Sequence, residues 1–253
     1  MKNLFLVIFF VSFFLRQTPV RAADAPWRLP ERERVVFQVK WLGIPAGRIV
    51  SEITGIVDWQ GHKAYRIEVT ARTIGICHTL YRVDDRYVSY LDAEHLYSLR
   101  HEIHRREGGY KKDAVIDFDQ EKHVAHFKSA TEDVEKVFSI PPDTQDTVSA
   151  AYAARTMPLL TGDHPVFSIC NSESIYTVAL PVTGNSRRRV HGLGLTDVVH
   201  LQPVGHVNGA KFRAGRMSGY VAAAPGHLPA LIIIKAPVFT QVTAILVENK
   251  IGK

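Results

Sequence analysis

The sequence predicts an all-β, mainly antiparallel fold, with one large curved meander sheet that forms an open or partly closed barrel and one helix docked near the middle of the chain. Apolar and polar residues alternate along most of the chain, as they do in strands with one buried face. Short polar or glycine-containing turns separate these runs, which favours antiparallel neighbours. A sheet of about ten or more strands rarely stays flat, so we expect it to curl.

Residues 1–22 have the pattern of a secretory signal peptide. One lysine precedes a nearly unbroken apolar run over residues 4–15, and Val20-Arg21-Ala22 offers a small-x-small cleavage site near Ala22. The run is too short to favour a membrane-spanning helix, the alternative being a retained anchor. We therefore expect an exported protein with one β-rich domain over residues 23–253 and no transmembrane segment after cleavage.

Charge and cysteine content narrow the function classes. Removing the leader takes away Lys2, Arg16 and Arg21 and no acidic residue, which lowers the formal net charge from +6 to +3. Such a mild excess gives little support to nucleic-acid binding. Cys77 and Cys170 would meet an oxidising compartment, where they either form one bridge between the two halves of the chain or stay reduced and buried.

The first β-rich half covers residues 31–140. Gly108-Gly109 predicts a strong hairpin turn, and the polar corner Asp84-Asp85-Arg86 predicts another. The strands expected here cover residues 35–41, 48–53, 65–71, 80–83, 87–91, 99–105, 110–118, 124–127 and 134–140.

A helix is expected over residues 143–157, between the two β-rich halves. Asp143 or Thr144 is a candidate N-cap, Arg155 suits the last turn, and Pro158 ends the helix. Apolar residues recur at the i, i+3, i+4 spacing that docks a narrow stripe against a sheet: Val148, Ala151 and Tyr152.

The second β-rich half covers residues 163–250. Gly192-x-Gly194 lacks the third glycine and the following helix of a nucleotide-binding loop, so it is interpreted as a turn. Arg187-Arg188-Arg189 is expected in a loop, either as a solvated hairpin tip or as a contact for an acidic partner or lipid head groups. The strands expected in this half cover residues 166–170, 175–180, 198–201, 211–217, 231–234 and 238–247.

Several segments together resemble a known family: ERERVVFQVKWLGIPAGRIV, VDDRYVSYLD, AVIDFD, IPPDTQDTVSAAYAART and a closing pair of apolar strands. In this order, after an exported leader, they are similar to the bacterial family called domain of unknown function 3108. The resemblance implies an exported, mainly antiparallel β protein of the bacterial envelope, hence a periplasmic location, and it implies no activity. The chain departs from the family pattern where Tyr220-Val221-Ala222-Ala223-Ala224 replaces a tryptophan and acidic residues.

Twelve histidines invite a metal hypothesis, which strand geometry disfavours. In His101-x-x-His104 and His123-x-x-His126 the two rings would face opposite sides of a strand. Asp117 and Asp119 share one strand face, which suits either calcium or acid–base chemistry but equally a solvated outer face. No nucleophile motif is found, and the sequence indicates no catalytic residue, metal or cofactor.

The candidate ligand-binding residues are Asp146, Tyr152 and Arg155, all in or beside the expected helix. Asp146 and Arg155 are nine residues apart, too far for a direct intrahelical pair, so each is free to contact the surrounding strands. One hypothesis gives them a purely structural role, with Asp146 as a capping aspartate and Arg155 at the helix end. The other turns them toward a ligand.

The sequence thus favours a non-catalytic binding or structural protein. Its concave β surface would hold an amphiphile such as a lipid, or another envelope component. The alternative is an envelope hydrolase whose carboxylates come from separate strands.

Overall fold

The computed structural model of the protein describes residues 27–172, 174–207, 210–211, 216–236 and 240–252. The expected signal peptide, part of the expected strand 211–217 and the start of 238–247 lie outside these residues. The first half of the chain forms β1 (Arg32–Trp41), β2 (Ile44–Trp59), β3 (His62–Thr73), β4 (Asp84–Asp92), β5 (Ser98–Glu107), β6 (Tyr110–Asp119), β7 (Val124–Ser129) and β8 (Val134–Ser139).

The second half contributes more strands, and two helices complete the described elements. The strands are β9 (Val166–Asn171), β10 (Ser174–Ala179), β11 (Val182–Val190), β12 (Gly194–Leu201), β13 (Val204–Val207), β14 (Ala210–Lys211), β15 (Arg216–Ala222), β16 (Pro229–Ala236) and β17 (Thr240–Gly252). The helices are α1 (Gly75–Leu80) and α2 (Thr147–Ala154).

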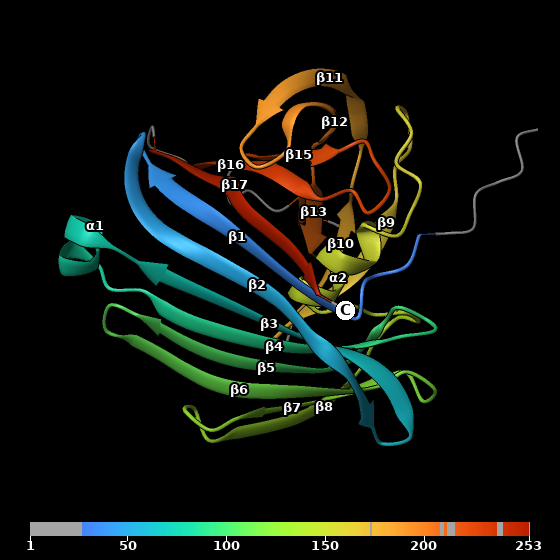
Figure 1. The fold of residues 1–253 in the computed structure, drawn as a ribbon. Coiled ribbons are helices and arrows are strands. Elements are labelled where there is room, and N and C mark those ends of the chain that lie inside the picture. The colour runs from blue at the N-terminus through green and yellow to red at the C-terminus, as the bar shows by residue number, and fades with distance from the viewer. Residues whose placement is uncertain (1–26, 173, 208–209, 212–215, 237–239, 253) are drawn as a thin grey trace, which may run out of the picture.

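Most of these strands belong to one large antiparallel sheet, as predicted. Its order is β11-β12-β15-β16-β17-β1-β2-β3-β4-β5-β6-β7-β8, so β11 and β8 are its two edges. The last strand, β17, pairs with the first, β1, which joins the two halves of the chain. A second sheet of described strands has the order β14-β13-β10-β9. Figure 1 shows the large sheet curled around α2, with α1 at a distant end of the sheet.

One face of the large sheet, which we call the inner face, carries the core. Residues directly opposite each other in an antiparallel sheet project to the same side. The register links one buried row across seven strands: Glu33, Ile53, Ile67, Ser89, His101, Ile116 and Phe127. Three side chains of this row are polar, Glu33, Ser89 and His101, and they lie on the side of the sheet that faces α2.

Three local predictions in the β-rich halves are wrong. Residues 80–83 do not form the expected strand, since helix α1 ends at Leu80. The hairpin turn expected at residues 84–86 is the start of the continuous strand β4, in which Asp85 pairs with Ala71. The polar residues fit a strand because Arg86 bonds to Glu68 and the Arg106 amide donates to Asp85. The loop expected around Arg187-Arg188-Arg189 is the edge strand β11, where charged residues are common because they discourage pairing with another chain.

Several other predictions are confirmed in detail. Gly108-Gly109 does form the turn between β5 and β6, in which Glu107 pairs with Tyr110. Gly192 lies in the turn between β11 and β12 with a positive φ of 77°. His101 is buried while His104 is partly exposed on the opposite face and contacts Asp113.

The close pairing of β2 and β3 depends on a glycine. A Cβ atom placed on Gly47 would lie 2.7 Å from the carbonyl oxygen of Arg72, nearer than real Cβ atoms come to backbone. We expect Gly47→Ala to lower the free energy of unfolding by about 1–3 kcal/mol, because the strands must move apart.

Gly109→Ala is the matched control, since a Cβ atom placed on Gly109 would meet no other atom within 4 Å. Chemical denaturation of both variants measures the difference. Equal stabilities of the two variants would show that β2 and β3 have room to relax.

Candidate functional site

Helix α2 begins at Asp146, whose buried carboxylate is its N-cap. Oδ1 accepts hydrogen bonds from the backbone amides of Val148 (2.6 Å) and Ser149 (2.9 Å), and the Ser149 hydroxyl accepts one from the Asp146 amide. This is a capping box, which satisfies the free donors of the first helical turn. The expected helix start was therefore several residues too early. Asp143 has a left-handed φ of 55° and is exposed, and Thr144 lies outside the helix.

The same carboxylate anchors the helix to the inner face. Its Oδ2 accepts hydrogen bonds from the hydroxyls of Ser89 on β4 and Ser98 on β5, each 2.6 Å long. Nδ1 of His101 lies 3.5 Å from Oδ1, beyond a good hydrogen bond. Asp146 thus holds two amides of its own helix and two strands of the sheet.

The segment before α2 connects this anchor to the second sheet. The Gln145 amide donates to the carbonyl of Ser168, and the Cys170 amide donates back to the carbonyl of Gln145, each at 2.8 Å. Gln145 also forms a parallel bridge with Ile169 on β9. Residues 144–146 therefore lie between the large sheet and β9.

The C-terminal half of α2 is held by a buried ion pair. The guanidinium of Arg155 binds both carboxylate oxygens of Glu33 on β1 and donates to the carbonyl of Gly226 at 2.9 Å. The Tyr152 hydroxyl lies 2.7 Å from that of Ser51 on β2. Burial raises the pKa of Tyr152 to about 12.

All three candidate ligand residues are thus buried and bonded to other protein groups. Asp146 lies at the start of α2, whereas Tyr152 and Arg155 lie at its end, and the polar atoms of all three are occupied by contacts within the fold. A ligand contact for Asp146, Tyr152 and Arg155 therefore stays a prediction. Sequence reasoning missed their partners, which include Glu33, Ser89 and Ser98. These partners could have been found from the sequence, because each is a polar residue at a strand position where an apolar one is expected.

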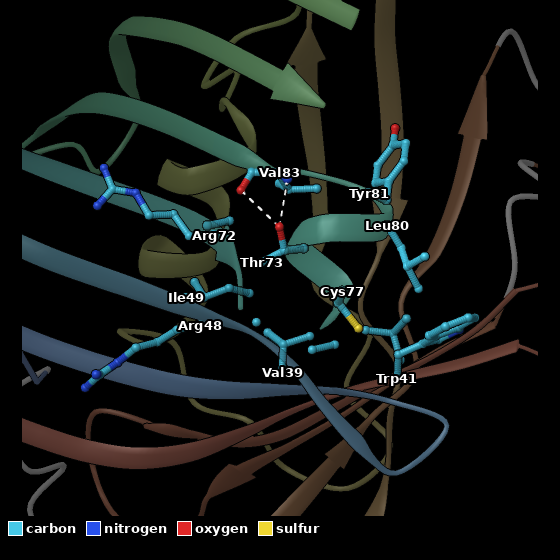
Figure 2. Close-up of a pocket in the computed structure, with 14 residues that line it drawn as sticks. Val39, Trp41, Arg48, Ile49, Arg72, Thr73, Cys77, Leu80, Tyr81 and Val83 are labelled. Atoms are coloured by element: carbon cyan, nitrogen blue, oxygen red, sulfur yellow. Dashed lines mark hydrogen bonds between the residues drawn. The ribbon is translucent and has the colours of Figure 1, made fainter. Parts of the chain in front are cut away.

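An apolar cavity lies on the same inner face, at the end of the sheet that carries α1. We call it the α1 chamber; its volume is about 450 Å³. Figure 2 shows side chains from the strands and from α1 around it, with Sγ of Cys77 pointing between Val39 and Trp41. Its lining is almost entirely carbon: Val39, Trp41, Ile49, Ala71, Leu80 and Val242 are among the residues that form it.

The polar side chains at the chamber are turned away or bonded. The Thr73 hydroxyl accepts a hydrogen bond from the Val83 amide at 2.9 Å. Arg48 and Arg72 point away from the cavity in Figure 2, and Nε of Arg72 donates to Asp84 at 2.7 Å. Val39 and Ile49 also pack against the buried core of the sheet. The chamber is therefore an open continuation of the hydrophobic core.

A second apolar hollow of about 300 Å³ lies beside α2. It is lined by the small side chains of the helix and by residues of β9, β10, β12, β15 and β16. Arg155 borders it, but its guanidinium is bonded to Glu33 and Gly226. The α1 chamber is larger and lies at exposed apolar residues, so we take it as the candidate binding site.

Two carboxyl groups from separate strands meet near the chamber. Burial raises the pKa of Asp85 on β4; the amide hydrogen bond from Arg106 opposes this, and a hydrogen bond with Glu107 on β5 adds to it. The pKa of Glu107 is lowered, first by its hydrogen bond from Arg105 and also by the one with Asp85. The two groups are thereby separated in acidity, as in an acid–base pair.

The two cysteines differ in environment and are not joined. Cys77 on α1 lines the chamber and is 9% exposed, whereas Cys170 on β9 is fully buried. Burial, and to a lesser degree the charge of Asp146, raises the pKa of the Cys170 thiol to about 12. Of the two, Cys77 is the thiol placed to react.

Neither a metal cluster nor a membrane-spanning helix is found among the described residues. No group of three or more histidine, cysteine or acidic residues is placed to hold a metal ion in the described part of the chain. His123 lies in a turn with a φ of 54°, whereas His126 lies on β7. Within the same described ranges, no helix has the length and apolar character needed to cross a membrane.

The fold and site define a class: one large, strongly curved antiparallel sheet accompanied by a small second sheet, with a helix anchored in its hollow and an apolar chamber at one end. The chain belongs to the family described as protein of unknown function DUF3108, which it matches over residues 36–246. The resemblance found in the sequence is thereby confirmed. No curated protein matches the chain.

Solved structures support the fold. A β-barrel-like protein of the domain of unknown function DUF1849 from Brucella abortus is 10% identical, with a TM-score of 0.60 over 90% of this chain and 100% of its own. A candidate lipoprotein from Parabacteroides distasonis is 12% identical, with a TM-score of 0.36, 90% of this chain and 100% of its own covered. A candidate exported protein with a YmcC-like fold from Bacteroides fragilis has 11% identity, a TM-score of 0.33 and coverages of 89% and 100%. The first structure shares the fold of this chain. The TM-scores of the other two are too low to show a shared fold.

The anchoring role of Asp146 is testable through stability. A carboxylate that only capped α2 would contribute about 1 kcal/mol. Because Asp146→Ala also leaves the Ser89 and Ser98 hydroxyls without their buried acceptor, we expect a loss of roughly 3 kcal/mol.

Asp143→Asn is the control, since Asp143 is exposed, lies three residues before the cap and has a left-handed φ that asparagine tolerates. We expect that change to stay within about 0.5 kcal/mol. Urea unfolding of both variants gives the comparison. A loss for Asp146→Ala no larger than that of a simple cap would contradict the anchoring role.

Proposed function

We propose that the protein is an exported, non-catalytic carrier or sensor that binds one apolar chain of an amphiphile in the α1 chamber. The observation that carries the proposal is the chamber itself, an open, carbon-lined cavity continuous with the core. Its volume of about 450 Å³ falls in the range of small-molecule sites, which are mostly apolar and concave. The proposed export rests on the leader over residues 1–22.

The energetics favour a chain over a polar ligand. Each buried methylene group contributes about 0.8 kcal/mol. About ten of them correspond to roughly 8 kcal/mol, the binding free energy of a micromolar complex before ordering costs are subtracted. A polar ligand would find few partners, because the Thr73 hydroxyl is already bonded to the Val83 amide and the arginines point outward. The polar head of an amphiphile would stay in water at the open side.

A hydrolase is the second candidate, favoured by the carboxyl pair of Asp85 and Glu107. Neither residue belongs to the lining of the chamber, and the Asp85 side chain is buried and bonded to the Arg106 amide. Catalysis would require a reacting group to approach them directly. Hydrolysis of p-nitrophenyl laurate that is lost in Asp85→Asn would favour this candidate over the binder.

Cys77 provides a direct test of chain binding. Its thiol lines the chamber, so laurate bound there should slow its alkylation by iodoacetamide, while Cys170 should stay unreactive in the folded protein. Ala71→Phe places a ring in the chamber, and in this variant laurate should no longer change the rate of alkylation.

Thr70→Phe is the matched control, because the neighbouring position on β3 projects to the other face of the sheet. Melting temperatures of both variants establish that they fold. Alkylation of Cys77 at the same rate with and without laurate in the wild-type protein would refute binding in the chamber.

A further inference from the structure

The end of the sheet that holds the α1 chamber also carries a cluster of exposed apolar side chains. We call it the apolar tip; it consists of Trp41, Leu42, Ile44, Ile76, Leu80 and Tyr81. These residues come from the β1–β2 turn and from α1 with its C-cap, and they are between 40% and 71% exposed. Scattered exposed apolar residues need no explanation, but a cluster of this kind marks an interaction surface.

The turn and the helix form one surface. The amide of Ile74, just before α1, donates to the carbonyl of Ala46 on β2 at 2.9 Å. Figure 1 shows α1 and the turn between β1 and β2 on the same side of the molecule. The turn consists of Leu42, whose φ is 49°, and Gly43, so the apolar side chains of Trp41 and Ile44 lie directly before and after it in the chain.

Basic side chains flank the apolar tip. Lys40, Arg48 and Arg72 lie on the ends of β1, β2 and β3, and Arg82 follows α1. Arg48, Arg72 and Arg82 have side chains more than half exposed. Asp84 pairs with Arg72 at 2.7 Å and lies 3.7 Å from Arg82, and Glu248 lies 3.9 Å from Arg48. These two carboxylates neutralise part of the charge of the four basic side chains and leave an excess of positive groups.

Apolar side chains surrounded by basic ones are complementary to a bilayer that contains anionic lipids. Aromatic and aliphatic side chains enter the boundary between head groups and acyl chains, while nearby lysines and arginines attract the anionic surface. A protein partner would be favoured by balanced charges of both signs around the cluster, whereas here four basic side chains are accompanied by two acidic ones, Asp84 and Glu248.

We propose that the apolar tip docks the protein on an anionic membrane surface, with the α1 chamber opening toward the lipid. Trp41, Leu80 and Tyr81 belong to both the tip and the chamber lining. A chain leaving the bilayer therefore reaches the chamber along side chains already in contact with lipid, without crossing water. Docking goes beyond the proposed chain binding and is tested separately from it.

The test is flotation of the mature chain with vesicles of phosphatidylcholine, with and without phosphatidylglycerol. We expect the wild-type protein to float with the anionic vesicles and to be released by salt, because the basic flank acts through a screened surface potential. The double substitution Leu42→Asp with Ile44→Asp should lower the vesicle-bound fraction at least about tenfold, since it places two charges in the apolar tip.

The matched control is Val137→Asp with Leu195→Asp, which changes two equally exposed apolar residues on β8 and β12, away from the tip. This variant should float like the wild-type protein. Absence of wild-type flotation, equal flotation of the tip variant, or an equal loss in the control would each overturn the proposal. A dimer that forms without vesicles and is abolished by the tip substitutions would likewise overturn it, in favour of a second copy.

The Cys77 assay distinguishes the two proposals. Laurate supplied as a monomer in solution should still protect Cys77 in the tip variant, because the substituted side chains lie outside the chamber lining. Retained protection with lost flotation supports docking as a separate step. Loss of protection in the tip variant would mean that its substitutions disturb the chamber, and would overturn the assignment of the tip to membrane docking alone.

Discussion

The arrangement depends on the buried carboxylate of Asp146. It caps α2 and accepts hydrogen bonds from two serines on the inner face, so the helix is fixed to the sheet at its first residue. The ion pair of Arg155 with Glu33 fixes the other end to β1. A charge buried this deeply is tolerated only when it is fully hydrogen-bonded, and Asp146 has four donors for its two oxygens.

The position of α2 determines where the inner face is filled and where it is open. Beside the helix, Val148 and Tyr152 pack with Ile53, Ile67 and Leu91, and the face is closed. Helix α2 does not reach the end of β1, the start of β2 or the end of β3. There the short helix α1 covers the inner face only in part. The α1 chamber lies there, so binding and anchoring are assigned to different parts of one surface.

Strand alternation predicted the sheet, and the number of strands predicted its curvature. Capping residues and helical spacing predicted the central helix, although its start was placed several residues too early. The pairing of β17 with β1 and the role of Glu33 were not predictable, because both depend on contacts between residues more than a hundred positions apart. Helix α1 was missed because it is six residues long and has no side-chain cap. The chamber was missed for a similar reason: its lining joins β1, β2, β3, α1 and β17, and no single segment carries its pattern.

Native mass spectrometry of the mature protein, purified from bacterial envelopes without detergent, tests the central claim most directly. If the α1 chamber holds an apolar chain, the wild-type protein should carry an amphiphile adduct, and Ala71→Phe should carry none while Thr70→Phe retains it. Wild-type protein free of any adduct, or an adduct that persists in Ala71→Phe, would contradict chain binding in the chamber.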